Sequence, residues 1–231
     1  MKGFFGACCA IVAFTAAGAA HAADAPGFYV GAEAGASFSQ SATWQDVNPT
    51  PDIWVFGIGQ HVNADVGTGA ILGLTGGYRF NDMFRADLSF DYRTGYSVST
   101  SQPGNIAIYK ANINALTFMA NGYVEPVRLG PFKPYVGVGV GAAIVTSSNA
   151  SAFFIGYTTP DPLAGQTQTN FAWQVSAGIA YEVNDRVAID LGYRHLDAGD
   201  VGVGANIPLG DSATKGSLVT NEVLLGVRYS F

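Results

Sequence analysis

Eight charged residues could form ion pairs. Each lies in a segment in which polar and apolar residues alternate. They are Glu33, Arg85, Asp87, Asp91, Arg93, Asp190, Arg194 and Glu222. Successive side chains of an extended strand point to opposite faces, so the charged residues share a face that excludes the apolar ones. Buried charges need partners of opposite sign, and both signs are present. Either the pairs fill an interior and fix strand register, or they line a polar path that opens when they rearrange.

Catalysis has fewer candidates. After residue 22 the histidines are His61 and His195. His195 is followed by Leu196 and Asp197, but no serine stands in nearby register to act as the nucleophile that a lipid-modifying barrel needs. Two distant histidines make no metal-ligand cluster. We therefore expect no catalytic residue, no metal site and no bound cofactor, and a lipid-modifying enzyme stays only as an alternative.

The first 22 residues have the pattern of an export signal. One positive charge at Lys2 precedes an apolar run, and Ala20, His21 and Ala22 fit the small-x-small cleavage pattern. Cleavage between Ala22 and Ala23 would leave a domain of residues 23–231. An uncleaved anchor is the alternative. Both cysteines, Cys8 and Cys9, lie in the signal, so the mature chain would carry no disulfide or thiol chemistry.

The charged face recurs in eight segments with period-2 alternation, and segment 84–93 is the clearest. The predicted strands are 28–38, 70–80, 84–93, 113–125, 134–144, 171–182, 186–194 and 223–231. Long connections at 40–69, 94–111, 146–170 and 195–217 alternate with short turns. Glycines at alternate positions of 134–144 would leave room for bulky neighbours across a narrow interior.

The composition indicates that the apolar faces of these strands meet lipid and that their polar faces point into a barrel. Charged residues make up 12% of the chain, against roughly 25% in ordinary soluble domains. The net charge of −6 argues against a nucleic-acid partner. Past residue 22 no apolar run is long enough for a spanning helix. We predict an all-β fold, an eight-stranded antiparallel up-and-down transmembrane barrel, closed by pairing of its first and last strands.

The chain resembles the small outer-membrane β-barrel family of Gram-negative bacteria, of the opacity-protein and OmpA-transmembrane-domain type. The residues that carry the resemblance are the terminal strand 223–231, the Pro-Tyr-Val-Gly-Val-Gly run at 134–139 and the Leu-Gly-Tyr-Arg run at 191–194. The resemblance implies the outer membrane as location, its lipid as surroundings and both mature termini in the periplasm. It also implies that Phe231 and Tyr229 form the signal read by the barrel-assembly machinery, so that deleting Phe231 should impair insertion.

Family members include structural barrels, adhesins, weak porins and a few lipid-modifying enzymes, so the resemblance does not decide the activity. We expect a monomeric structural barrel that contributes to envelope integrity, with small-solute conductance no more than weak because eight strands enclose little more than their own side chains. A surface adhesin that acts through its long loops is the alternative.

Overall fold

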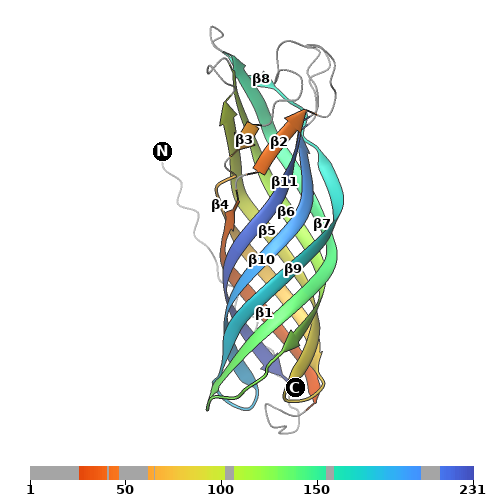
Figure 1. Ribbon diagram of the computed structural model, residues 1–231, viewed down its shortest axis with the longest axis vertical. Helices are drawn as coiled ribbons and strands as arrows, with labels where there is room; N and C mark the ends of the chain where they lie inside the picture. The colour runs from red at the N-terminus through yellow and green to blue at the C-terminus, as the bar shows by residue number, and fades with distance from the viewer. Residues whose placement is uncertain are drawn as a thin grey trace.

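The computed structural model describes residues 26–40, 42–46, 62–64, 66–101, 107–154, 159–203 and 214–231. It shows one elongated β-barrel (Figure 1) built from eight long antiparallel strands. These are β1 (Gly27–Ser39), β4 (Thr68–Arg79), β5 (Phe84–Ser101), β6 (Ala107–Val124), β7 (Phe132–Phe154), β9 (Thr167–Glu182), β10 (Val187–Val203) and β11 (Thr214–Ser230). No helix in these ranges is long and apolar enough to cross a membrane.

The barrel closes through its first and last strands. β1 pairs with β11 over eleven positions, from Tyr29 opposite Ser230 to Ser39 opposite Thr220. Every other long strand pairs with its sequence neighbours. The predicted fold class and the predicted closure are therefore both confirmed, and closure pairs the edges that an open sheet would expose.

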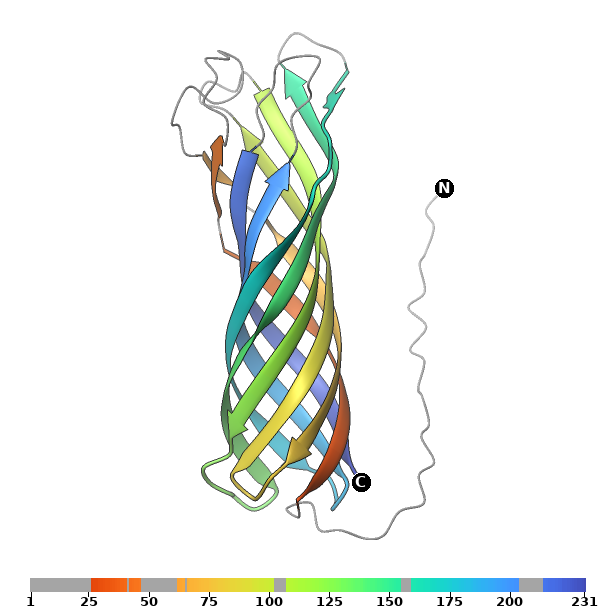
Figure 2. The same ribbon diagram turned by 90° about the vertical axis from the view of Figure 1, so that its right-hand side faces the viewer.

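Short turns join the strands at one end of the barrel, which we call the turn end, and the longest strands extend to the opposite end, which we call the loop end (Figure 2). The C-terminus lies at the turn end. Three short strands lie at the loop end: β2 (Ala42–Asp46), β3 (Val62–Ala64) and β8 (Asp161–Pro162). β2 pairs with both β3 and the start of β11, and β8 pairs with β7.

The predicted extents of the long connections are wrong, because strands continue well into them. β5 and β6 have 18 residues each and β7 has 23, whereas a membrane-spanning strand needs about 9–11. The register shifts between Arg93 and Tyr96, and Gly95 there has a φ of 94°. A bulge of this kind inserts a residue and breaks the period-2 pattern, so the sequence reads as a loop where the strand goes on.

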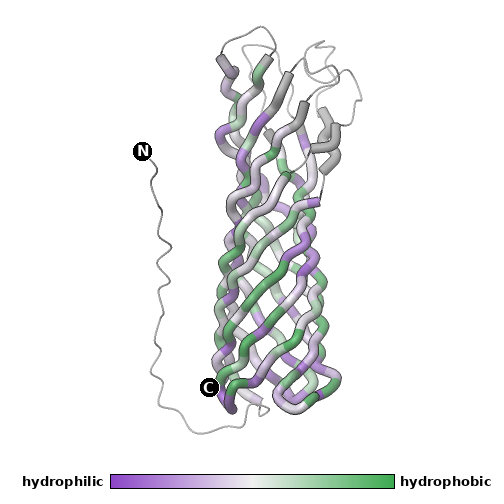
Figure 3. Tube along the Cα trace, turned by 90° about the vertical axis from the view of Figure 1, so that its left-hand side faces the viewer, coloured by the Kyte–Doolittle hydropathy of each residue, from purple (hydrophilic) through white to green (hydrophobic). Residues whose placement is uncertain are grey.

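Near the turn end the barrel has the inside-out polarity of a membrane protein. Outward positions are mostly apolar, and the alternate inward positions are mostly charged, polar, small or tyrosine, an alternation that can be followed along the strands in Figure 3. Aromatic pairs such as Phe132 with Tyr181 and Tyr229 with Phe231 lie near the turn end. Such an outward apolar band with aromatic edges is the surface that a lipid bilayer covers.

At the loop end the polarity is reversed. Ser97, Ser99 and Asn112 point outward, while fifteen buried residues fill the interior. We call this group the loop-end core: Val66, Tyr96, Val98, Ala111, Ile113, Ala115, Met119, Ala143, Val145, Ala150, Ala172, Leu196, Ala198, Val201 and Leu218. A polar outside around an apolar inside is the arrangement of a water-soluble sheet. The strands therefore leave the lipid and continue into water.

Candidate functional site in the barrel lumen

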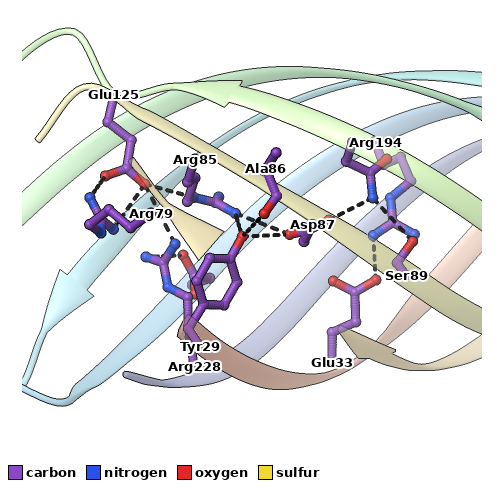
Figure 4. A network of polar contacts seen from close by, with 12 residues as sticks. Tyr29, Glu33, Arg79, Arg85, Ala86, Asp87, Ser89, Glu125, Arg194 and Arg228 are labelled. Carbon is purple, nitrogen blue, oxygen red and sulfur yellow. Dashed lines mark hydrogen bonds and ion pairs between the residues drawn. The ribbon is translucent and has the colours of Figure 1, made fainter. Parts of the chain in front are cut away.

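The lumen near the turn end holds a cluster of ion pairs around one carboxylate, Glu125 (Figure 4). Arg79 Nη1 and Arg85 Nε each donate a hydrogen bond of 2.7 Å to it, and Arg228 Nη1 lies 3.5 Å from its Oε1. Arg228 also contacts Asp190 at 3.4 Å, and Arg85 contacts Asp87 at 3.4 Å. This turn-end cluster, made of these six residues, contains three guanidinium groups and three carboxylates and is electrically balanced.

A second cluster lies farther toward the loop end. Arg93 donates to both oxygens of Glu222, at 2.7 and 3.1 Å, in the bidentate geometry that makes arginine–carboxylate pairs strong. Arg194 bridges three carboxylates: it pairs with Glu33, lies 3.3 Å from Asp91 Oδ2 and lies 3.5 Å from Glu222 Oε2. We call Glu33, Asp91, Arg93, Arg194 and Glu222 the middle cluster.

Neutral polar side chains and aromatic rings fill the space beside the clusters. Asn121 Nδ2 donates to Asp87 Oδ1 at 2.8 Å, and Gln174 Nε2 donates to Asn121 Oδ1 at 2.7 Å. The guanidinium of Arg85 stacks on the ring of Tyr123, 3.7 Å from its centroid. A cavity of about 50 Å³, lined in part by Tyr29 and the charged groups, lies among them. Such a volume holds only a few water molecules.

The structure places all eight charged residues singled out from the sequence on the lumen face, and each makes at least one ion pair. The selection left out Arg79, Glu125 and Arg228, although the alternation places all three on inward faces and Glu125 lies at the centre of the turn-end cluster. The signal that could have found them is the same alternation. Arg79 stands two residues after Gly77 and Glu125 two after Tyr123, so both continue an inward face to the end of the strand.

His195 lies outside the lumen. Its ring contacts the Trp173 ring at 5.7 Å, and its Nδ1 is 2.9 Å from Asn221 Oδ1. Asp197, on the same face, accepts a hydrogen bond from the backbone N–H of Gly199. These contacts hold an aromatic edge and a bulge in place. His61 and the cleavage position between Ala22 and Ala23 lie outside the described residues.

Comparison with known proteins agrees with this architecture. Residues 6–231 match the sequence model of the outer membrane protein beta-barrel domain. The chain belongs to this family. Outer membrane protein PagN of Salmonella typhimurium is 29% identical to the barrel over 257 aligned positions that cover both chains completely. An uncharacterized protein of Brucella suis is 37% identical over 145 residues, which cover 55% of this chain and 51% of the Brucella protein.

Among solved structures, the barrel is similar to the outer membrane protein OprG from Pseudomonas aeruginosa. The TM-score is 0.50 at 16% identity, and the match covers 89% of this chain and 96% of the OprG chain. Identity at that level supports the shared fold alone. The fold and the family are thus those of an outer-membrane barrel, and the activity has to be argued from the lumen and the loop end.

Proposed function

We propose that the protein is a structural outer-membrane barrel that spans the lipid without conducting solutes. The observation that carries this proposal is the loop-end core. Ile113, Val145, Leu196 and Leu218, each at most 1% exposed, meet across the lumen and close it with apolar side chains. An ion that crossed this layer would lose its hydration shell and would meet mainly apolar side chains. The ion pairs below the core then serve to fill the lumen and fix strand register, and they require no transport role.

Planar-bilayer recording tests this function. Refolded protein is expected to show no discrete openings, because both the apolar layer and the paired charges would have to separate to admit hydrated ions. A conducting porin inserted from the same detergent at the same protein-to-lipid ratio is the control for insertion and sensitivity. Discrete, reproducible openings from the barrel would contradict the proposal.

The proposal includes the route to the membrane. Residues 1–22 act as a cleaved export signal, residues 23–231 form the mature barrel, and both mature termini face the periplasm. The rings of Tyr229 and Phe231 pack edge to face, with their centroids 5.4 Å apart. Recognition by the assembly machinery is supported by this aromatic pair at the end of the chain, in which Phe231 is exposed and Tyr229 is partly exposed. A monomer is proposed, because the closed barrel leaves no long strand edge that needs a partner. No catalytic role is proposed.

Surface contact is the second candidate function, favoured by the length of the strands at the loop end. β5, β6 and β7 carry the loop end beyond the outward apolar band, on a packed apolar core instead of on bare loops. A Rickettsia conorii protein named as a candidate adhesin is 35% identical over 128 residues, which are 53% of this chain and 51% of that protein. A rigid raised end would hold binding loops clear of the lipid headgroups.

Cell-binding assays test surface contact. Bacteria that display the barrel are expected to adhere to host cells more than bacteria that display a variant with residues 102–106 and 204–213 replaced by Gly-Ser segments of equal length. Equal surface amounts and equal heat-modifiable mobility would show that the variant barrel has folded. Equal adhesion by both would exclude these two connections from adhesion.

A further inference from the structure

Two carboxyl groups of the middle cluster lie next to the Cα of one glycine, Gly73. Glu33 on β1 is opposite Gly73 on β4, and Gly73 is opposite Asp91 on β5, so the three residues form one row across three neighbouring strands. A β-carbon at Gly73 would lie 2.9 Å from Glu33 Cγ and 3.2 Å from Glu33 Oε1, and it would collide with Asp91 Oδ1. Because Gly73 has no side chain, the two carboxyl groups can both approach the space that a β-carbon would fill.

The charges of the middle cluster do not balance. Glu33, Asp91 and Glu222 supply three carboxylates, while Arg93 and Arg194 supply two guanidinium groups. The turn-end cluster, with three of each sign, has no spare cation to offer. If all three carboxyl groups were ionised, the middle cluster would carry one uncompensated negative charge, with two of its carboxylates close together, an arrangement that strongly favours protonation of one of them.

One oxygen of this group also lacks a partner. Asp91 is 0% exposed, and its Oδ2 accepts hydrogen bonds from Thr117 and Arg194, both at 3.3 Å. Its Oδ1 has no hydrogen-bond partner among the described residues. A buried carboxylate oxygen without a donor is rare and unfavourable. Asp91 is not among the residues that line the lumen cavity, whereas Glu33 is.

We propose that Glu33 and Asp91 share one proton, so that a carboxylic acid donates to a carboxylate across Gly73 and the lumen is a proton-binding site. One proton supplies the missing donor for Asp91 Oδ1 and cancels the surplus charge. The other ionisable residues that face the pair or line the adjoining cavity come from six strands. They are Arg194, Asp190 and Tyr193 from β10, Glu222 and Arg228 from β11, Arg85, Asp87 and Arg93 from β5, Tyr29 from β1, Tyr123 from β6 and Tyr135 from β7. At this level β4 and β9 contribute Thr75 and Ser176.

The shared proton makes stability depend on pH in a defined direction. Unfolded Asp and Glu side chains release their protons near pH 4, so at neutral pH the folded chain would hold one proton more than the unfolded chain. Stability from this source is therefore present at low pH and is lost as the pH rises through the titration of the folded pair. Between about pH 4 and the pH at which the folded pair releases its shared proton, the unfolding equilibrium constant should increase by up to about tenfold per pH unit.

Infrared spectroscopy of the refolded barrel in phosphatidylcholine vesicles tests the proposal directly. At pH 7 the wild type is expected to show a protonated-carboxyl C=O band that shifts in D2O. Asp91→Asn should remove the band, because its amide nitrogen can take the place of the proton donor beside Glu33. Glu33→Gln should remove it as well. Asp82→Asn, which changes an exposed carboxylate on the turn between β4 and β5 and leaves the charges of the lumen as they are, is the control and should retain the band.

The same variants allow a second measurement. In urea, the ratio of the unfolding equilibrium constant of the wild type to that of Asp91→Asn should rise with pH, by up to about tenfold per pH unit. A wild type without the band at pH 7, or a band that survives in both Asp91→Asn and Glu33→Gln, would overturn the shared proton. Stabilisation of the wild type alone by NaCl over choline chloride, without the band, would instead place a monovalent cation there. Because these readouts do not involve conductance or adhesion, the proton site and the proposed function can fail separately.

Discussion

Replacing Glu125 with glutamine is expected to lower the free energy of unfolding by about 3–5 kcal/mol, the range for a buried ion pair that loses one partner. Arg79, Arg85 and Arg228 all contact this carboxylate, and its side chain is 1% exposed. The amide has the same shape but no charge, so three guanidinium groups would be left with Asp87 and Asp190 only. Urea unfolding in vesicles would measure the loss, and a gel comparing boiled and unboiled samples would show whether the variant folds.

The proposed cause can be separated from a packing defect by restoring the charge balance. A double variant, Glu125→Gln with Arg79→Met, leaves two guanidinium groups and two carboxylates in the turn-end cluster and should recover a large part of the lost stability. Asp82→Asn, on the exposed turn between β4 and β5, is the control and should change stability by no more than about 0.5 kcal/mol. If the double variant were less stable than Glu125→Gln, uncompensated charge would not be the reason for the loss.

The sequence predicted the membrane-spanning part of this barrel well because one physical rule holds there throughout. Lipid outside and a polar lumen inside impose a strict period of two, as between Phe84 and Arg93, and the closure of β1 on β11 follows from the need to pair every backbone amide. The inward glycines of β7 also behave as predicted. A β-carbon at Gly137 would collide with the ring of Tyr123, so the glycine provides the room that this ring occupies.

The loop end could not be predicted because the rule changes there without any change of secondary structure. At Gly95 and Gly199, both with positive φ, bulges shift the alternation, and beyond them the outward face meets water. Serine and asparagine then stand outward where lipid-facing residues would have continued the pattern. Tyr96 and Val98 are buried, although between Phe84 and Arg93 every apolar residue points outward. The individual ion pairs could not be predicted either, because the alternation shows on which face of the sheet a charged side chain lies but not which residue it contacts.

Placing an arginine on the outward face is expected to reveal where the lipid ends. Val138 points outward on β7 and is 66% exposed. It lies between Phe132 and Ala142, the position opposite Phe171 on β9. Val138→Arg should lower the free energy of unfolding in phospholipid vesicles by about 2–4 kcal/mol, the penalty for arginine near the bilayer midplane.

Ser97 points outward beyond the bulge of β5, opposite Asn112 on β6. Ser97→Arg should change stability by about 0–1 kcal/mol, because its guanidinium would remain in water or at the interface. Equal penalties at the two positions would mean that lipid covers the loop end as well, and the apolar residues inside it would then need another explanation than a sheet that has left the membrane.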